Sequence, residues 1–374
     1  FAQKHCMGFT VISVVGARPN FIKIAPIDKA FRAYPEIRHI ICHTGQHFDE
    51  AMSKVFFDEL QIPKPHYNLG VSGGSHARQT AAIMTAFEDV LLQEKPDLVI
   101  VPGDVNSTLA ASLTAAKLHI PVAHVEAGLR SFDRAMPEEI NRVIADQLSD
   151  LLFVTEESGI QHLAVEGIPK EKVFFTGNVM IDSLVRQMPL IDHSGILNQL
   201  GLQEKSYLLC TFHRPSNVDN KEQLTELIAM LNELAVNSKV VLPLHPRTRN
   251  NMSSFGLLGQ LGSNFIITDP LGYIDFLALT KHARLLITDS GGVQEETTFL
   301  QVPCITVRDN TERPVTCTLG TNTLAGTDLN HVRKVIQDQL SQKMPEGTIP
   351  PLWDGRAAER IVEIIANYLN KSHS

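Results

Sequence analysis

The chain has 374 residues, of which 43% are hydrophobic and 20% are charged, and its formal net charge is −8. This length predicts two domains, because a single hydrophobic core rarely grows beyond about 250–300 residues. The negative charge argues against a general nucleic-acid or membrane-surface binder. No apolar run approaches the ~20 residues of a membrane-spanning helix, and residues 1–7 lack the apolar core of a signal peptide, so we expect a cytoplasmic protein.

Short apolar segments alternate with amphipathic stretches along the chain. We predict strands at 10–15, 40–43, 98–101, 122–125, 151–154, 207–211, 239–242, 265–267, 285–288 and 304–307. Helical patterns separate them, as at 22–31, 81–93, 109–117, 138–148, 221–234, 293–300 and 355–369. Most of the strands are apolar throughout, which is typical of parallel sheets covered on both faces. The fold class is therefore α/β with doubly wound sheets.

Residues 190–205 interrupt this alternation, and we place the domain boundary there. We predict a first domain at 8–190, a second at 205–354, and a final helix at 355–371 that could pack on either half. Ligands of such sheets bind beyond the carboxyl ends of the strands, and two such edges facing each other would form a cleft.

The five cysteines, at positions 6, 42, 210, 304 and 317, have no metal-like spacing. Three of them lie in apolar, strand-like runs, so we expect buried thiols in a reducing cytoplasm and no metal site.

Residues 289–296 read Asp-Ser-Gly-Gly-Val-Gln-Glu-Glu and join a buried strand to a helix. The unpaired N–H groups and the helix dipole at such a turn favour a phosphate, and Glu296 stands about one turn further on, where a sugar hydroxyl could donate to it. In the first half, residues 15–23 carry Arg18 and Lys23 but lack the G-x-G-x-x-G dinucleotide fingerprint. Cations at a helix start oppose its dipole, so we expect an anion between them, although both could simply be solvated.

Three acids follow predicted strands or begin helices in the first half: Asp104, Glu126 and Glu138. Each has an ordinary explanation, because Asp104 could cap a helix, Glu126 could pair with Arg130, and Glu138 could mark a helix start. Together they form a candidate acid/base cluster.

In the second half, His213-Arg214 and His245-Pro246-Arg247 follow adjacent strands, and Arg308 and Arg313 add positive charge at the same edge. We expect a diphosphate site there, with some of the arginines paired to Asp309, Glu312 or Glu295. Carboxylates in one half and diphosphate donors in the other favour a nucleoside diphosphate-sugar as ligand.

In combination these motifs resemble the UDP-N-acetylglucosamine 2-epimerase family of bacteria and archaea, from about residue 10 to residue 368. The resemblance implies the GT-B architecture, a homodimer without cofactor or metal, and interconversion of UDP-GlcNAc and UDP-ManNAc for cell-surface polysaccharides. It implies catalytic roles for Asp104, Glu126, Glu138 and His213. It implies substrate or UDP binding by Arg18, Lys23, Leu271, Phe276, Ser290, Gly291, Gly292, Glu296 and Arg313.

The family chemistry is physically reasonable. A carboxylate cannot remove the weakly acidic C2 hydrogen directly, but loss of UDP from C1 acidifies it and gives a 2-acetamidoglucal. UDP then adds again with C2 inverted, while donors on the diphosphate stabilise the leaving group and the closed site excludes water.

Two departures leave alternatives open. Gln46 and His47 match a family allosteric site and Arg78 aligns with one of its arginines, but the cation that follows Gln-His in many members is absent. The segment between Glu126 and Glu138 is also shorter than in those members. A hydrolysing epimerase that releases ManNAc and UDP and a 2-epimerase of UDP-2,3-diacetamido-glucuronate therefore remain alternatives. A GT-B glycosyltransferase, which would need an acceptor, is an alternative from another functional class.

Overall fold

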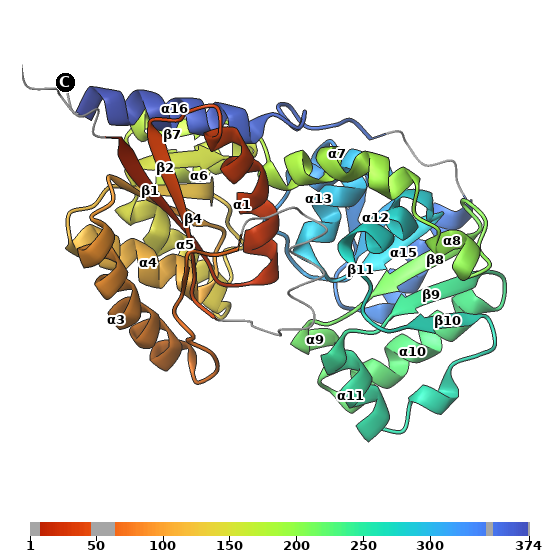
Figure 1. The fold of residues 1–374 in the computed structure, drawn as a ribbon. Helices are drawn as coiled ribbons and strands as arrows, with labels where there is room; N and C mark the ends of the chain where they lie inside the picture. Colours follow the sequence, from red (N-terminus) through yellow and green to blue (C-terminus); the bar gives the residue numbers. More distant parts are fainter. Residues whose placement is uncertain (1–7, 46–63, 342–346, 373–374) are drawn as a thin grey trace, which may run out of the picture. The chain divides into compact units, whose positions relative to one another are not determined.

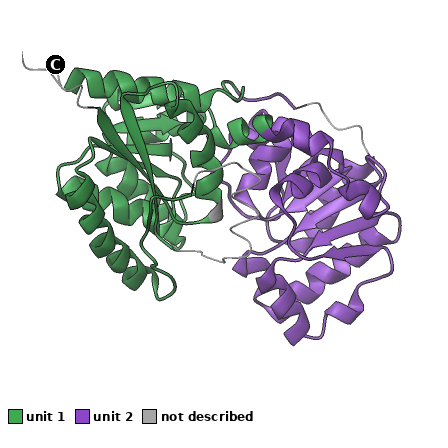
Figure 2. Cartoon of the chain, in the orientation of Figure 1, with its two compact units in different colours: residues 1–186, 351–374 green, residues 187–350 purple. Residues whose placement is uncertain are grey.

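A computed structural model describes residues 8–45, 64–341 and 347–372. The contacts divide the chain into two compact units, which are residues 1–186 with 351–374 (unit 1) and residues 187–350 (unit 2) (Figure 2). The chain leaves unit 1 inside helix α7 (Val179–Asp192), slightly before the predicted boundary at 190–205. It returns at residue 351, so the final helix belongs to unit 1.

Unit 1 contains a seven-stranded sheet in the order β3-β2-β1-β4-β5-β6-β7, with parallel pairing throughout. The strands are β1 (Phe9–Val15), β2 (Ile37–His43), β3 (Tyr67–Asn68), β4 (Leu98–Pro102), β5 (Val122–Ala127), β6 (Leu151–Val154) and β7 (Val173–Phe175). Its helices are α1 (Arg18–Phe31), α3 (His76–Glu94), α4 (Asn106–Lys117), α5 (Pro137–Leu148), α6 (Glu157–Val165), the 3₁₀ turn Lys170–Lys172, α7, and α16 (Ala357–Ser372).

The sheet of unit 1 is covered on both faces. Buried side chains of β1, β2 and β4 pack with apolar side chains of α3 and α4. Figure 1 shows α1 and α16, which contact each other, on the opposite side of the sheet. Helix α16 has its own buried apolar face, and just before it the indole N–H of Trp353 donates to the Thr155 carbonyl at 2.9 Å.

Unit 2 contains a six-stranded parallel sheet in the order β10-β9-β8-β11-β12-β13. The strands are β8 (Tyr207–Thr211), β9 (Lys239–Pro243), β10 (Phe265–Thr268), β11 (Leu285–Thr288), β12 (Cys304–Thr306) and β13 (Asn322–Leu324). Its helices are α8 (Ile196–Gln199), α9 (Pro215–Val218), α10 (Lys221–Ala235), α11 (Pro246–Ser254), the 3₁₀ turn Leu258–Gln260, α12 (Tyr273–His282), α13 (Gly291–Leu300), α14 (Val315–Thr318) and α15 (Leu329–Ser341).

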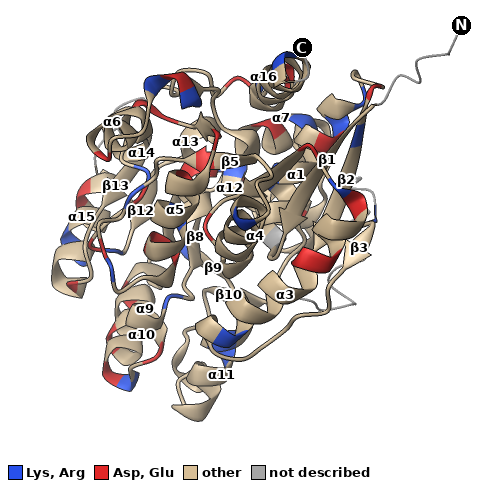
Figure 3. Cartoon of the chain, turned by 90° about the vertical axis from the view of Figure 1, so that its left-hand side faces the viewer, with Lys and Arg blue, Asp and Glu red and all other residues tan. Residues whose placement is uncertain are grey.

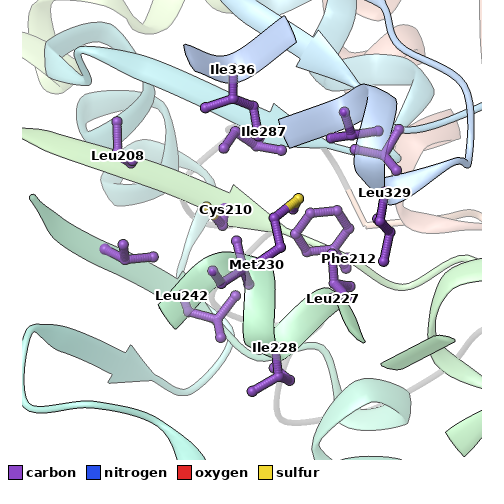
Figure 4. Close-up of a cluster of buried hydrophobic side chains, with 14 of the residues drawn as sticks. Leu208, Cys210, Phe212, Leu227, Ile228, Met230, Leu242, Ile287, Leu329 and Ile336 are labelled. Carbon is purple, nitrogen blue, oxygen red and sulfur yellow. The ribbon is translucent and has the colours of Figure 1, made fainter. Parts of the chain in front are cut away.

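The core of unit 2 lies where α10 and α15 cover the sheet. Leu208 and Cys210 of β8 and Ile287 of β11 pack against Leu227 of α10 and Ile336 of α15 (Figure 4). Cys42, Cys210 and Cys304 are buried free thiols, as predicted, and burial raises the pKa of the Cys42 thiol to about 12.

All ten predicted strands are present, with small changes at their ends. Strands β3, β7 and β13 were not predicted. They are short strands at sheet edges, where a brief apolar run gives little signal. Within the described ranges no helix is long and apolar enough to cross a membrane. Basic and acidic residues are interspersed along helices such as α10 and α15 (Figure 3).

Candidate functional site

Both sheets have a topological switch point. This is a pair of adjacent strands from which the chain connections lead towards opposite edges of the sheet. In unit 1 this point lies between β1 and β4, and in unit 2 between β8 and β11. Ligands of doubly wound sheets bind outside the carboxyl ends of the strands at such points. The loops after β1, β4, β8 and β11 contain most of the motifs that the sequence analysis selected.

Asn20 fixes the loop after β1 in unit 1. Its side-chain oxygen accepts from the N–H groups of Gly16 at 3.1 Å and Ala17 at 2.9 Å. Its amide group donates to the Pro102 carbonyl at 3.0 Å, at the end of β4. One buried side chain therefore ties together the two loops at the switch point.

Glu126 occupies a β-bulge near the end of β5. The register with β6 shifts between Val125 and Ala127, and Glu126 has a φ of 71°, a left-handed conformation that costs an L-residue about 1–2 kcal/mol. Bulges next to active sites turn a side chain in a new direction. Here the buried carboxylate of Glu126 forms an ion pair with Lys23 of α1.

This pair argues against two of the alternative interpretations. Arg130 is not the partner of Glu126, because its guanidinium binds Asp146 at 2.7 Å and Glu166 at 2.6 Å. Lys23 holds a carboxylate of the protein rather than standing as a solvated cation. Arg18 is the first residue of α1, and its side chain lies outside the described part of the structure.

Asp104 follows β4 and is held from α5. Its carboxylate forms an ion pair with Arg142, and its backbone carbonyl accepts from the Asn141 amide at 2.8 Å. Val105 is the N-cap of α4, and its side chain makes no capping hydrogen bond. The carboxylate is therefore positioned by side chains from another element.

Glu138 and Glu139 begin α5 but have different surroundings. Glu139 is buried, pairs with Arg142, and accepts from the N–H groups of Ser131 and Phe132 at 2.9 Å each. Glu138 is half-buried and has no ion-pair partner in the described part of the chain. Glu139 thus fixes the loop between β5 and α5, while the side chain of Glu138 remains available for a ligand.

In unit 2 the buried carboxylate of Asp289 holds His213 in place. It accepts from the N–H groups of His213 and Arg214 at 3.0 and 2.9 Å, and from the Asn217 amide at 3.1 Å. It also lies 3.1 Å from Nδ1 of His213. Burial by itself raises the pKa of Asp289, but the contacts with His213, Asn217 and the Arg214 N–H outweigh it and lower the pKa below its ordinary value.

The Ser290–Gly292 turn begins α13 without a side-chain cap at Ser290. A Cβ atom added at Gly291 would lie 2.9 Å from Nη1 of Arg313, so the guanidinium closely approaches this turn. Arg313 lies 2.8 Å from Glu295, and Arg308 lies 2.7 Å from Glu312, which confirms that the arginines here are paired with acids. Helix N–H groups and a nearby guanidinium together favour an anion.

The other predicted ligands of unit 2 lie on neighbouring elements. Glu296 is a buried residue of α13, Phe276 is half-buried on α12, and Leu271 lies in the loop before α12. Helices α12 and α13 contact each other. The roles of these residues in binding uracil and ribose stay predictions.

The second His/Arg motif, at His245 and Arg247, has contacts different from those of the first, at His213 and Arg214. The His245 side chain accepts from the Arg247 N–H at 3.2 Å and caps α11, and Arg247 binds Asp219 at 2.7 Å. The centroids of the His213 and His245 rings lie 5.5 Å apart. Gln46 and His47 lie outside the described residues, while Arg78 is exposed in the first turn of α3.

The residues that hold the predicted site residues in place were not predicted from the sequence. These are Asn20, His124, Glu139, Asn141, Arg142 and Asp146. Arg142 and Asn141 occur in the Pro-Glu-Glu-Ile-Asn-Arg segment, so their helical spacing from Glu138 was the available signal.

Comparison with known proteins identifies the family. A family model described as UDP-N-acetylglucosamine 2-epimerase matches residues 29–366. A UDP-N-acetylglucosamine 2-epimerase of Methanocaldococcus jannaschii is 43% identical over 360 residues, covering 94% of this chain and 97% of the relative. A UDP-2,3-diacetamido-2,3-dideoxy-D-glucuronate 2-epimerase of Pseudomonas aeruginosa is 41% identical, covering 95% and 99%.

A crystal structure agrees with these relatives. The Methanocaldococcus jannaschii UDP-GlcNAc 2-epimerase in complex with UDP-GlcNAc and UDP superposes with a TM-score of 0.88 at 42% identity, covering 96% of this chain and 100% of the other. The two Rossmann-like units are those of the GT-B architecture. The chain therefore belongs to the UDP-N-acetylglucosamine 2-epimerase family.

Proposed function

We propose that the protein interconverts UDP-GlcNAc and UDP-ManNAc without net hydrolysis. The observation that carries the proposal is the division of chemistry between the two switch points. Unit 1 presents the carboxylates of Asp104 and Glu126, each fixed by a cation, and unit 2 presents the Ser290–Gly292 turn beside Arg313. Membership of the epimerase family explains this division, because the reaction of a nucleotide-sugar needs donors for the diphosphate and carboxylates for the sugar.

In unit 2, the turn and its cations bind the diphosphate. The N–H groups of α13, Arg313 and His213 stabilise the charge that develops on UDP when the bond between C1 and the phosphate oxygen breaks. We propose that Phe276 and the backbone at Leu271 bind uracil, and that Glu296 accepts from the ribose hydroxyls. Retention of UDP is essential, because an oxygen of its terminal phosphate must form the new bond to C1.

In unit 1, the acids transfer the proton at C2. Loss of this proton and of UDP leaves a 2-acetamidoglucal, and return of a proton to the opposite face of C2, with UDP adding to C1, completes the inversion. Removal from one face and delivery to the other calls for more than one proton carrier. Glu126, Asp104 and Glu138 are the carboxylates that we assign to these transfers, and Lys23 and Arg142 keep the first two in place.

The test follows UDP-GlcNAc in deuterated water by proton NMR. We expect UDP-ManNAc to appear with deuterium at C2 in both nucleotide-sugars, because the proton exchanges with solvent during the glycal stage. Stoichiometric ManNAc and free UDP would instead identify a hydrolysing enzyme. Turnover that needs an added acceptor would identify a glycosyltransferase.

A second substrate has a specific observation in its favour. The Pseudomonas aeruginosa relative, at 41% identity, is a UDP-2,3-diacetamido-2,3-dideoxy-D-glucuronate 2-epimerase. The same NMR assay with UDP-2,3-diacetamido-glucuronate gives the preference directly, as the ratio of kcat/KM for the two substrates. A larger value for the uronate would replace UDP-GlcNAc as the assigned substrate.

We also propose that the enzyme is a cytoplasmic homodimer whose UDP-ManNAc supplies the synthesis of cell-surface polysaccharide. This assignment is supported by the family resemblance. Light scattering with size-exclusion chromatography is expected to give twice the mass of one chain, and a monomer would contradict the first part.

A further inference from the structure

A buried cluster of charged side chains adjoins the candidate acids of unit 1. Asp146 of α5 is fully buried, and its carboxylate binds Arg130 at 2.7 Å and lies 2.6 Å from Nδ1 of His124. Arg130 also binds Glu166, the residue directly after α6, at 2.6 Å. The proposed proton transfers use none of these groups, although His124 lies on β5 with Glu126 and Asp146 lies on α5 with Glu138.

Both ring nitrogens of His124 face oxygen atoms that accept hydrogen bonds. Nδ1 lies 2.6 Å from Oδ1 of Asp146, and Nε2 lies 2.8 Å from the carbonyl of Gly103. A neutral imidazole has a single N–H. Its other nitrogen would then place a lone pair against an oxygen that also has only lone pairs to offer. An imidazolium donates to both oxygens, and with Arg130, Asp146 and Glu166 it leaves the cluster without net charge.

The surroundings of Asp146 agree with an ionised carboxylate. Burial by itself would raise the pKa of Asp146, but the charges and hydrogen bonds of His124 and Arg130 outweigh it and lower the pKa below its ordinary value. A buried carboxylate and two buried cations are costly unless each is paired, and here each is.

This cluster links the two loops that carry the acids. The Gly103 carbonyl, which His124 contacts, belongs to the peptide group that leads into Asp104. The N–H of Gly128, two residues after Glu126, donates to Oδ2 of Asp146 at 3.0 Å. Asp146 therefore holds the loop after β5 directly and the loop after β4 through His124.

We propose that His124 is a positioning residue for the epimerisation, acting as an imidazolium that joins Asp146 to the Gly103 carbonyl and so sets Asp104 relative to Glu126. This inference rests on the proposed function. Proton removal and return at one carbon require both carboxylates at fixed places, and a displacement of about 1 Å can lower a rate by about 100-fold.

The chain offers a matched control in the same sheet. His39 of β2 is also buried between a carboxylate and another oxygen, with Nδ1 2.9 Å from Asp28 and Nε2 2.8 Å from the hydroxyl of Ser13. A hydroxyl can donate or accept, so a neutral ring satisfies both contacts. Neither Ser13 nor Asp28 lies on the loops that carry Asp104 and Glu126.

The experiment compares His124→Gln with His39→Gln in the full chain. We expect His124→Gln to lower kcat by about 100-fold while KM and the affinity for UDP stay unchanged, since UDP is assigned to unit 2. His39→Gln should lower thermal stability similarly and keep kcat. An unchanged kcat in His124→Gln, or an equal loss of kcat in both variants, would overturn the proposal.

A second measurement does not depend on the folding of a variant. In wild-type protein labelled with ¹⁵N-histidine, we expect the His124 signal to show protons on both nitrogens under the conditions of the kinetic assay. A neutral His124 ring would refute the proposal. Wild-type protein without epimerase activity would refute the proposed function instead, and the NMR spectrum would still decide the charge of His124.

Discussion

Units 1 and 2 both place charged side chains at the switch point of a parallel sheet, but they balance these charges in opposite ways. In unit 1 the candidate functional groups are carboxylates and their partners are cations, as in Glu126 with Lys23. In unit 2 the candidate groups are donors and their partners are acids, as in His213 with Asp289 and Arg313 with Glu295. In both units the partner holds the candidate group in place. The group held is a carboxylate in unit 1 and a hydrogen-bond donor in unit 2.

This difference separates the expected effects of substitution. Changes in unit 1 should lower turnover and spare nucleotide binding, because its carboxylates transfer protons. Changes in unit 2 should weaken nucleotide binding first, because its donors hold the diphosphate.

The largest effect is expected from Glu126→Gln. The amide cannot accept the C2 proton, so kcat should fall by about 10²–10⁴-fold, the usual contribution of general acid–base catalysis. Calorimetric titration should give the wild-type affinity for UDP. Retained turnover would remove Glu126 from the mechanism, and an equal loss of UDP binding would end the separation between the units.

The same substitution at two glycines tests the comparison more finely. Gly103 has a φ of 67°, and a Cβ there would lie 2.9 Å from Nζ of Lys23 and 3.6 Å from Oε2 of Glu126. We expect Gly103→Ala to lower kcat by about 100-fold through displacement of this pair, with UDP affinity unchanged.

In unit 2, Gly291→Ala places a Cβ 2.9 Å from the guanidinium of Arg313. We expect the Kd for UDP to rise by about tenfold, which corresponds to about 1.4 kcal/mol, and kcat at saturation to change less. The two alanine variants are each other's control. A drop in kcat without a change in Kd for Gly291→Ala would contradict the assignment of this turn to UDP.

Two buried aspartates predict opposite responses of stability to pH. In unit 2, the pKa of Asp289 is lowered, so its contribution to stability is present above the ordinary value of 3.8 and is lost as pH falls through the folded-state value. Asp289→Asn should reduce the loss of unfolding free energy on acidification by up to about 1.4 kcal/mol per pH unit. Hydrogen exchange of amides in β8 and β11 measures it, and identical acid profiles would contradict the expectation.

In unit 1, Asp182 accepts from the N–H groups of Ala357 and Ala358 at 3.1 and 2.7 Å, and burial raises its pKa to about 6. The folded state therefore binds the proton more tightly, so stability should decrease as pH rises from about 4 to 6, with a limiting slope of about 1.4 kcal/mol per pH unit. Asp182→Asn should remove this decrease. Urea unfolding followed by the fluorescence of Trp353, the single tryptophan, measures it.

The regular parts of the fold were predictable because each depends on a local pattern. Apolar runs gave the strands of both sheets, and the order of strands and helices gave two doubly wound units. The bulge at Glu126 was not predictable, since residues 122–127 read as one continuous strand and a left-handed glutamate leaves no local signal. Tertiary contacts decide that conformation.

The charge partners were also beyond the sequence. Arg130 lies four residues from Glu126 and was the obvious partner, but the actual partner is Lys23, 103 residues away. Arg142 likewise pairs with Asp104, which lies 38 residues earlier in the sequence. The sequence therefore indicated which residues form the candidate site, while the pairing depends on how β1, β4, β5 and α5 meet in three dimensions.

The late return of the chain to unit 1 affects the order in which the units mature during synthesis. Residues 1–186 emerge first, but α16, which contacts α1, emerges only after all of unit 2 has been made. At about 5–20 residues per second this delay is on the order of ten seconds or more. During that time the nascent unit 1 exposes the apolar surface that Ile361, Ile365 and Leu369 later cover. Unit 2, although it starts later, is the unit that can be completed first.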